Sequence, residues 1–462
     1  MSIFDSPAKK SALLVFTLTS LLTPFMAASI NIALPQIGEY FAIDAVLLSW
    51  VATSFLLTAA MFLVPFGRMA DTYGRKKIFT IGISAYTLFS LACGLSTSVT
   101  MLIVFRVLQG IGSAMIFGTG IAILTSVFPA DERGQVLGIN VAAVYFGLSA
   151  GPFFGGLLTE HLGWRSVFYV NVPVGILIVL IVLWRLRGEW AEAKGEKFDL
   201  FGSFIYCISL VLIMYGFSLL PNLPGFWFIA AGIAAVLLFV WWELRVESPV
   251  FNMNLFRKNS VFALSNLAAL VNYAATYAVT FLLSLYLQYI KGFGAESAGI
   301  ILVSRPIVMA VTSVFAGRLS DRIEPRVVAS IGMALVTVGL VLLIPIGSST
   351  SLGFIITALM ILGLGFGLFS SPNMNAIMGS VERKYYGVAS GTAGTMRLLG
   401  QMFSMGIATL LFAVYIGRVP ITPSNHDVFL SSVRAAFMIF SALCFAGIFA
   451  SLARGRLRKT IV

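Results

Sequence analysis

GRMADTYGRKK, at Gly67–Lys77, closes one long apolar run of this chain, and GRLSDRIEPR, at Gly317–Arg326, closes another. Both strings open with Gly-Arg, carry an aspartate four residues after the glycine, and continue into basic residues. A charged turn that recurs between apolar runs predicts a chain built from two related membrane halves. Such a repeat favours a transporter whose halves rock against each other and disfavours a pure channel.

The composition requires a bilayer as the solvent. Of 462 residues, 59% are hydrophobic and 10% are charged, which is more apolar surface than a soluble domain of this length can bury. We therefore expect an all-α polytopic membrane protein with 14 transmembrane helices. The apolar runs lie at roughly 12–34, 46–66, 78–97, 100–127, 135–158, 165–184, 200–220, 226–242, 260–289, 297–316, 327–346, 352–376, 387–416 and 428–452.

Two strongly polar interruptions divide these runs. One extends from Arg185 to Asp199 and the other from Glu243 to Lys258, and two apolar runs joined by a tight turn at Pro221–Gly225 lie between them. We expect an N-terminal six-helix bundle at 1–184, cytoplasmic linkers with a two-helix insert at 185–258, and a C-terminal six-helix bundle at 259–462.

The loops account for the net charge of +12. With both termini in the cytoplasm, most of the 30 lysines and arginines, including the cluster Arg454–Lys459, fall in cytoplasmic segments, as the positive-inside rule requires. We therefore expect a multi-pass protein of the plasma membrane, a monomer in contact with the lipid bilayer that binds no nucleic acid.

The first apolar run and the cysteines carry no sign of processing or of a cofactor. The run is long enough to span and ends in no small-residue cleavage site, so we expect it to stay as a helix. Cys93, Cys207 and Cys444 each fall inside an apolar run, where we expect them to pack as small residues. The sequence thus predicts no disulfide, no metal site and no cofactor.

The two repeated turns are candidate latches on the cytoplasmic side. Gly67 allows a helix of the other half to approach closely, Asp71 can favour a helix N-terminus, and Arg75 can pair with an acid of the next cytoplasmic loop. The alternative is an orientation signal with a weak surface ion pair. The candidate latch residues are Gly67, Asp71, Gly74, Arg75, Asp131, Glu132, Gly317, Asp321 and Arg326.

The fourth run places three notable residues on one helix face. Arg106, Gln109 and Gly110 are spaced i, i+3 and i+4, and an arginine at this depth must face the protein interior. Such a group either organises a structural hydrogen-bond network or acts on the substrate or a proton. Both interpretations are open at this point.

The fifth run is a candidate pivot. Its glycines recur four residues apart, which permits close helix packing, and its proline removes a backbone donor and bends the helix. Glycine spacing alone would also suit a dimerisation groove. The candidate pivot residues are Gly147, Gly151, Pro152, Gly155 and Gly156.

These motifs, in this order, resemble the major facilitator superfamily, in particular its fourteen-helix drug:proton antiporter branch. The resemblance implies the major facilitator fold, with two six-helix bundles related by a pseudo-twofold repeat plus two inserted helices. It further implies a central cavity, alternating access, and proton-driven export of amphipathic compounds. The motifs that carry it are Asn31–Pro35, Gly67–Lys77, Arg106–Gly112, Gly147–Gly156 and Trp164–Pro173.

One departure from this branch weakens proton antiport. Relatives commonly carry an aspartate five residues before Asn31, where this chain has Met26, which we count among the cavity residues. The acids all fall in loops or at predicted helix ends, so no mid-membrane acid is left to carry a proton. Coupling through Asp71, Glu160 or another helix-end acid, a different ion, and facilitated diffusion are the alternatives.

Three arginines lie within the predicted membrane region. Arg106, Arg305 and Arg397 are each bonded to backbone carbonyls and amides, or they give the cavity a preference for anionic or zwitterionic amphiphiles. Under the second interpretation, neutralising Arg305 lowers the affinity for an anionic substrate.

The ninth run supplies a polar stripe suited to line a cavity. Its six polar residues fall on one helical face, and a tyrosine offers an amphipathic ligand both a ring and a hydroxyl. Helix–helix hydrogen bonding is the alternative. The stripe consists of Asn266, Tyr273, Tyr277, Thr280, Ser284 and Gln288. We expect Asn31, Gln109, Asn140, Tyr145 and Gln401 to face the same space, and Asn373 and Asn375 to lie at an inner gate.

Together these features predict a secondary transporter that works by alternating access and exports small amphipathic, drug-like compounds. The runner-up is a lipid or glycolipid flippase on the same fold, whose arginines attract a phosphate headgroup. A membrane-embedded enzyme is disfavoured because no acid or histidine lies at mid-membrane to act as a base or nucleophile.

Overall fold

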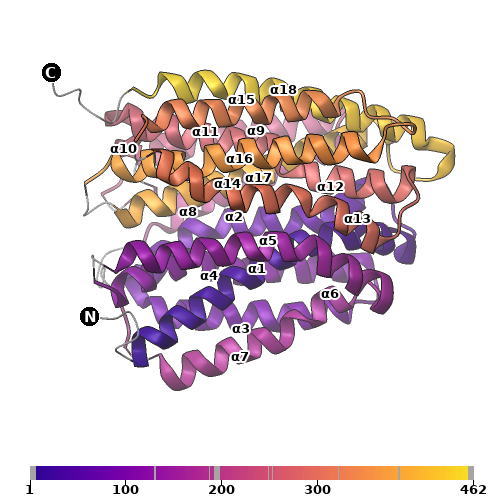
Figure 1. The fold of residues 1–462 in the computed structure, drawn as a ribbon. Coiled ribbons are helices and arrows are strands. Elements are labelled where there is room, and N and C mark those ends of the chain that lie inside the picture. The colour runs from indigo at the N-terminus through magenta and orange to yellow at the C-terminus, as the bar shows by residue number, and fades with distance from the viewer. Residues whose placement is uncertain are drawn as a thin grey trace.

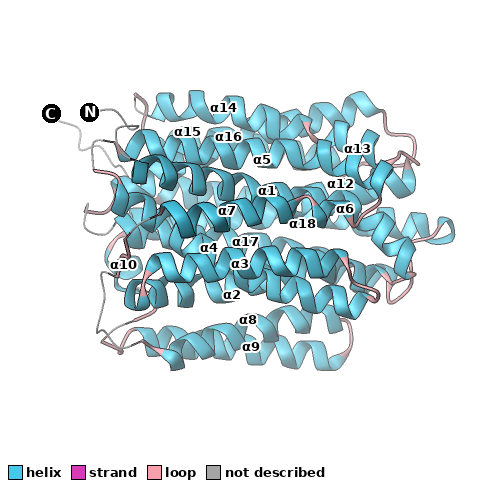
Figure 2. Ribbon diagram, turned by 90° about the horizontal axis from the view of Figure 1, so that it is seen from below, coloured by secondary structure: helices cyan, strands magenta, loops and turns pink. Residues whose placement is uncertain are grey.

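The computed structural model is a bundle of long helices that run roughly parallel to one another (Figure 1). It describes residues 7–129, 132–186, 188–191, 198–247, 249–251, 253–320, 322–382 and 386–455. Fourteen helices are long and apolar enough to cross a membrane, which confirms the predicted number of spans. Helix α1 begins and α18 ends on the same face of the bundle, which we call the terminal face; the other is the opposite face (Figures 1 and 2).

The first six spans come from α1 to α7, and two further spans from α8 and α9. Their bounds are α1 Pro7–Phe41, α2 Ala45–Tyr73, α3 Arg75–Gly94, α4 Val99–Val127, α5 Arg133–Leu162, α6 Ser166–Tyr169, α7 Asn171–Arg185, α8 Leu200–Leu219 and α9 Leu223–Glu243. Helices α6 and α7 together form one span. Helix α1 ends at Phe41, seven residues beyond the predicted end of its apolar run, because the more polar residues after Leu34 continue the helix.

The last six spans come from α11 to α18. Their bounds are α10 Met253–Lys258, α11 Ser260–Thr276, α12 Ala278–Leu285, α13 Ala295–Leu302, α14 Ser304–Ser320, α15 Pro325–Leu343, α16 Leu352–Gly379, α17 Tyr386–Leu411 and α18 His426–Ala453. Short π-helical turns at Tyr286–Ile290 and Phe412–Ile416 extend α12 and α17. The pairs α11–α12 and α13–α14 each form one interrupted span.

The two halves repeat the same packing pattern. In the first half α1 packs on α5, while α4 packs on both α2 and α3; in the second half α11 packs on α17, while α16 packs on both α14 and α15. The repeat extends to single close approaches, since the backbones of Gly82 and Gly112 meet between α3 and α4 as those of Gly332 and Gly365 meet between α15 and α16. This packing supports the division of the chain near residues 185 and 258, which stays a prediction.

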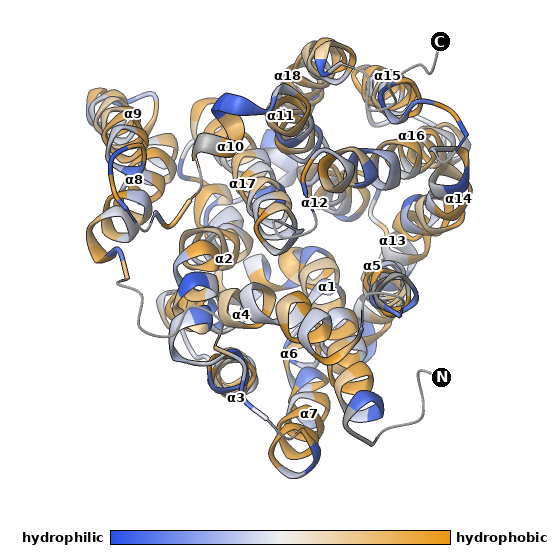
Figure 3. Ribbon diagram, turned by 90° about the vertical axis from the view of Figure 1, so that its left-hand side faces the viewer, coloured by the Kyte–Doolittle hydropathy of each residue, from blue (hydrophilic) through white to orange (hydrophobic). Residues whose placement is uncertain are grey.

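Helices α8 and α9 stand at one edge of the bundle as a hairpin (Figure 3). Helix α8 packs on both α2 and α17, where these two helices of opposite halves meet. The Tyr206 hydroxyl donates to the carbonyl of Ala60 at 3.0 Å, and Met214 packs against Gly406 on α17. The insert therefore covers a seam between the halves.

The ninth span breaks at Tyr277, in the middle of the predicted polar stripe. The break frees the carbonyl of Thr276 and the N–H of Ala278 from helical hydrogen bonds. Arg305 Nη1 donates to the Thr276 carbonyl at 2.9 Å, and the Ala278 N–H donates to Ser404 Oγ at 2.9 Å. Arg305 lies beside Pro306 in the first turn of α14, the second half of a span that breaks at Val303. Two interrupted spans thus support each other.

The halves are sealed together at the opposite face. Hydrogen bonds that cross between them join Ser49 to Thr409 at 2.9 Å, Gln288 to the carbonyl of Ile32 at 3.0 Å, and the N–H of Glu296 to Glu160 at 2.7 Å. Among the described residues, the crossing hydrogen bond that lies nearest the terminal face joins the hydroxyls of Tyr145 and Ser370, at 3.2 Å. The described chain is therefore closed at the opposite face.

Substituting Gly156 by leucine is expected to open this seal, because α13 lies against Gly156 so closely that the Ala295 carbonyl leaves no room for a side chain. Overpacking of this kind costs about 1–3 kcal/mol, enough for a shift of roughly tenfold in the closed-to-open ratio. The readout is the labelling rate of a cysteine at Ser49, fully buried in the seal, in a background without Cys93, Cys207 and Cys444.

Gly138→Leu on the same helix is the matched control, since nothing lies within 4 Å of the position that its side chain would take. Equal labelling rates in the two variants would contradict the seal.

Candidate substrate pathway

Arg106 belongs to a structural network inside the first half. Its side chain is 1% exposed, Nε donates to the carbonyl of Val51 at 3.0 Å, and Nη1 donates to Gln109 Oε1 at 2.6 Å. The guanidinium also lies over the ring of Phe55, 4.3 Å from its centroid. Gln109 in turn donates to Ser90 on α3 at 2.7 Å. Arg106 and Gln109 thus join α2, α3 and α4, the first of the two interpretations; a role toward substrate stays a prediction.

Arg305, like Arg106, donates a hydrogen bond to a backbone carbonyl. Besides the Thr276 carbonyl, it lies 3.5 Å from Thr280 Oγ1, and its guanidinium is 5.9 Å from the centroid of Phe366. Its first role is therefore to stabilise the break in the ninth span.

Arg397 differs from the other two arginines. It is half-buried on α17, and none of the described residues forms a hydrogen bond or ion pair with it. Its guanidinium lies 5.4 Å from the ring centroid of Phe117, on α4 of the other half. It also lies within electrostatic range of the Tyr145 and Tyr273 hydroxyls. Arg397 is thus a cation between the halves whose donors are available to a ligand.

Two tyrosines and a serine complete the surroundings of Arg397. The hydroxyls of Tyr145 on α5 and Ser370 on α16 form the bond between the halves described above. Tyr273 packs edge-on against Phe366, with ring centroids 5.4 Å apart. A cation, hydroxyl groups and aromatic faces therefore gather from both halves, a combination suited to an amphipathic ligand with an anionic group. We call Tyr145, Tyr273, Phe117, Ser370 and Arg397 the central cluster.

The predicted polar stripe is open in its middle and at its Gln288 end, and Gln288 lines a cavity at the opposite face. Tyr273, Tyr277 and Thr280 are partly exposed. Asn266 is fully buried and donates to the carbonyl of Phe262 within its own helix. At the other end, Gln288 donates to Ser284, which is fully buried, and takes part in the seal. Asn266 and Ser284 therefore follow the helix-packing alternative, whereas Gln288 lines a cavity, as a stripe residue was expected to do.

Four other predicted cavity residues lie on α1, α5 and α17. Met26 is fully buried against the amide of Asn171 at 3.2 Å. Asn31 is buried and donates to the carbonyl of Ala27 in its own helix, while Asn140 binds Ser20 at 2.8 Å and so joins α1 to α5. Met26, Asn31 and Asn140 thus pack between helices rather than facing the central cluster. Gln401 is half-buried on α17.

The first repeated turn makes its contacts within its own half. Gly67 lies against Gly118 of α4 in this state, and the expected approach of the other half at this glycine stays a prediction. Arg75 donates to Asp71 at 2.7 Å and to Ser126 at 2.8 Å. In this state the turn after α2 is therefore packed on α4 of its own half.

Asp131 and Glu132 are the two acids predicted as partners of Arg75. Glu132 pairs with Lys9, at 2.6 Å, rather than with Arg75. Asp131 lies outside the described residues, as does Asp321 of the second turn. Gly317 packs near Ser371 of α16, and Arg326 is half-buried near the start of α15. The latch role of the two turns stays a prediction.

The linker after α7 caps the first turn. Gly74 has a φ of 116°, which favours glycine, and α3 begins directly after it. The N–H of Arg75 donates to the carbonyl of Trp190 at 2.8 Å, and the N–H of Lys76 donates to the Glu189 carboxylate at 2.8 Å. A carboxylate at a helix N-terminus is favourable, so the linker is docked on the turn.

The pivot helix α5 has two faces with different neighbours. Gly147, Gly151 and Gly155 lie against α1 of the same half, each too close for a side chain. Gly156 and Pro152 instead face α13 of the other half, where the Pro152 carbonyl meets Gly299. The contact between halves expected of this helix thus rests on two of the five residues, and the pivoting motion stays a prediction.

Arg454 and Asn373 belong to a buried cluster near the terminal face. Arg454 is 1% exposed and donates to Asn373 Oδ1 at 2.6 Å and to the Pro325 carbonyl at 3.1 Å. Burial lowers the pKa of Arg454 to about 10, which leaves it charged at neutral pH. Arg454 therefore anchors α18 to α15 and α16 in addition to any part in orientation. Asn375 is exposed and binds Ser320 at 2.7 Å.

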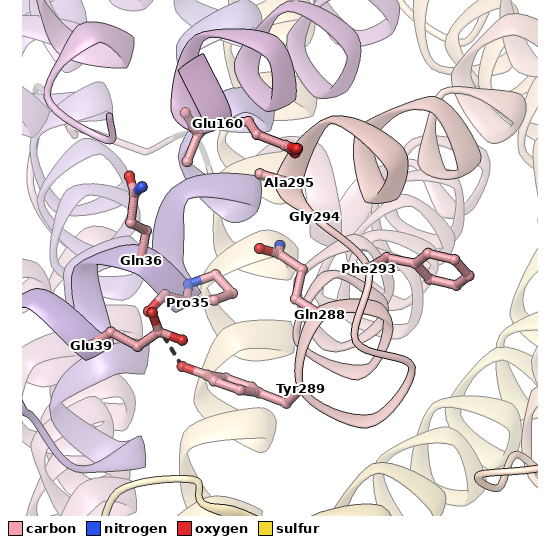
Figure 4. A pocket seen from close by; sticks show the side chains of 10 residues that line it. Pro35, Gln36, Glu39, Glu160, Gln288, Tyr289, Phe293, Gly294 and Ala295 are labelled. Atoms are coloured by element: carbon pink, nitrogen blue, oxygen red, sulfur yellow. Dashed lines mark hydrogen bonds between the residues drawn. The ribbon is translucent and has the colours of Figure 1, made fainter. Parts of the chain in front are cut away.

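A cavity of about 330 Å³ lies at the opposite face, between α1, α5 and the turn before α13 (Figure 4). Glu39 and Glu160 both line it, and Tyr289 donates to the carbonyl of Pro35 at 3.4 Å beside it. Sequence reasoning missed this cavity, as it missed Phe117 and Ser370 of the central cluster. An aromatic residue or a serine in an apolar run gives no signal of the neighbour it will meet.

Comparison with known proteins agrees with this architecture. The sequence profile of the Major Facilitator Superfamily matches residues 16–404 and 265–460. The chain belongs to this superfamily. It is therefore a multi-pass secondary transporter of small molecules and not an enzyme.

Relatives of this superfamily member are named for drug resistance, export or transport. The chain is 31% identical over 399 residues to the multidrug resistance protein Stp of Mycobacterium tuberculosis, covering 84% of this chain and 73% of the relative. It is 30% identical over 451 residues to the cephamycin export protein CmcT of Amycolatopsis lactamdurans, covering 94% and 91%. It is also 29% identical over 422 residues to the riboflavin transporter RibZ of Clostridioides difficile, covering 91% of each.

A solved structure shares the fold of this superfamily member. The inward-facing, unoccupied bacterial homologue of the human lysosomal transporter Spinster superposes with a TM-score of 0.71 and 16% sequence identity, over 97% of each chain. At this identity the likeness concerns the fold alone.

Replacing Arg106 by alanine is expected to destabilise the transporter even without substrate. The change leaves the Val51 carbonyl and the Gln109 amide oxygen without their buried donor, at a cost of about 3 kcal/mol. The measurement is the free energy of unfolding in mixed micelles. Arg397→Ala is the control, because that side chain has no hydrogen-bond or ion-pair partner among the described residues. If both variants lost the same free energy of unfolding, Arg106 would not have the structural role that distinguishes it from Arg397.

Proposed function

We propose that this chain exports small amphipathic compounds across the plasma membrane by alternating access, with the terminal face in the cytoplasm. The observation that carries the proposal is the central cluster, in which Arg397 of one half faces Phe117 and Tyr145 of the other. A ligand bound there touches both halves at once, as alternating access about a central site requires. The seal at the opposite face then corresponds to a cytoplasm-facing state.

The relatives support export over uptake. Stp and the cephamycin export protein are named for resistance and export, and each is about one-third identical to this chain. The basic residues on the terminal face support a cytoplasmic position for both termini. In this orientation, the state described here takes up its ligand from the cytoplasm.

The second candidate function is a flippase for a lipid or glycolipid on the same fold. Arg397 favours it, since an unpaired guanidinium suits a phosphate headgroup as well as a soluble anion. The two functions differ in the source of the ligand, which is the membrane leaflet for a flippase and the aqueous phase for an exporter.

Transport by proteoliposomes tests the proposal. The purified full chain is reconstituted, and counterflow of paired anionic and cationic fluorescent amphiphiles of similar size is measured. We expect counterflow of the anionic probe above the level of protein-free liposomes. Fluorescent phospholipid scrambling without probe counterflow would favour the flippase, and absence of both would overturn the transport proposal for these ligand classes.

Arg397→Gln is expected to lower the affinity for the anionic probe by roughly tenfold, because the ligand loses a partly desolvated charge pair. The affinity for the cationic probe should stay level or rise. The measurement is the concentration dependence of counterflow for both probes. Arg418→Gln, which removes an exposed arginine beyond α17, is the charge-matched control. Equal loss for both probes would show that Arg397 does not select by charge.

A further inference from the structure

Two carboxyl groups meet at the terminal-face end of the α8–α9 hairpin. Asp199 is the residue directly before α8, and Glu243 is the last residue of α9. One oxygen of each lies within 3.0 Å of the position that a Gly202 side chain would take, so the two oxygens are no more than about 5 Å apart. Only a glycine leaves room for both.

Three of the four carboxyl oxygens are occupied by donors. Asp199 Oδ1 accepts from the N–H of Gly202 and Asp199 Oδ2 from the indole of Trp242, both at 2.8 Å. Glu243 Oε2 accepts from the N–H of Phe251 at 2.8 Å. Among the described residues Glu243 Oε1 has no hydrogen-bond partner of ordinary geometry, although Glu243 is 2% exposed; the backbone N–H of Val250 is a second neighbour of this carboxyl, beside that of Phe251. A buried oxygen without a partner in a native protein indicates a missing ligand or proton.

No cation faces this pair among the described residues. The charged residues of the loop and of α10, Arg245, Glu247, Arg257 and Lys258, are all exposed. Arg245 stacks on Trp241, 4.1 Å from its ring centroid. On α8, the Tyr206 hydroxyl is committed to Ala60, and Cys207 donates to the Met61 carbonyl at 3.4 Å. The charged group that acts on Glu243 is therefore Asp199.

We propose that Asp199 and Glu243 form a proton-binding site, in which the proton resides on Glu243 Oε1. A second carboxyl this close to the buried Glu243 disfavours the ionised form of Glu243. The proton is placed on Glu243 Oε1 because both oxygens of Asp199 already accept from N–H donors. A metal ion does not fit, since it requires several free oxygens and this site offers one.

The position of the pair connects proton binding to the movement of the halves. The hairpin lies on both α2 and α17, through Tyr206 on one side and Met214 on the other. Loss of the proton places two negative charges at the end of the hairpin and draws Glu243 toward water, which changes how α8 rests on the seam. Proton coupling through this pair would not need an acid at Met26. This last step rests on the proposed transport function.

Infrared difference spectroscopy of the full chain in nanodiscs tests the site directly. In the wild type, the C=O stretch of a protonated carboxyl should disappear as the pH is raised, and Glu243→Gln should remove this titrating band. Glu247→Gln changes an exposed acid of the same loop and should leave the band intact. Asp199→Asn keeps a capping side chain but removes the like charge, so the band should disappear at a lower pH.

Several spectroscopic results would overturn the site. They are a titrating band that persists in Glu243→Gln, a wild-type band that never titrates, or an unchanged midpoint in Asp199→Asn. A midpoint that falls when choline is replaced by sodium would also overturn it, because a metal cation would then compete for the same oxygens.

Transport measurements test the coupling separately. Glu243→Gln should keep counterflow, which needs no gradient, within about twofold of wild type, while losing accumulation driven by a pH gradient. Accumulation equal to wild type, or no gradient-driven accumulation in the wild type, would overturn the coupling. Absence of counterflow in the wild type would instead count against the proposed function, and the infrared result would still decide the proton site.

Discussion

In a bilayer, each backbone N–H and C=O group needs a partner within the protein, and this constraint governs the centre of the transporter. The ninth span breaks at Tyr277, and the freed groups are bound by Arg305 and Ser404 from two other spans. Because those partners come from α14 and α17, the break is stable only when the second half is assembled. Tyr273 and Thr280, on either side of the interruption, are both partly exposed.

The same constraint explains why most of the arginines in or near the spans have hydrogen-bond partners within the protein. A guanidinium within the membrane is costly unless its donors are bound, and Arg106 and Arg305 are each bound to a backbone carbonyl. At the terminal face, Arg454 donates to the Pro325 carbonyl and to the Asn373 side chain. Arg397 is the exception, since its neighbours are an aromatic ring and hydroxyl groups at a distance. Among the described residues Arg397 is thus the arginine of these four whose donors are left for the ligand of the proposed function.

The sequence sufficed for the spans and the repeat because both depend on local composition. Hydropathy is summed along one segment, and the repeated turns are short strings, so neither requires knowledge of a neighbour. The candidate site was less predictable because the partner of a side chain is set by how helices pack. Gly151 and Gly156 belong to the same predicted pivot motif, yet one faces α1 and the other α13. Met26 likewise occupies a position where relatives carry an acid, but nothing local shows that it packs on Asn171.

The two inserted helices are more than a spacer between the halves. Their linker caps α3 through Glu189 and Trp190, so it is fixed to the turn that follows α2. Helix α8 then rests on the middle of α2 and on α17 of the other half. An element fixed to one half at its start and packed across the seam must be displaced, or must slide on α17, whenever the halves rotate. The free energy of that contact therefore belongs to the transport cycle, and any charge change at Glu243 acts on it.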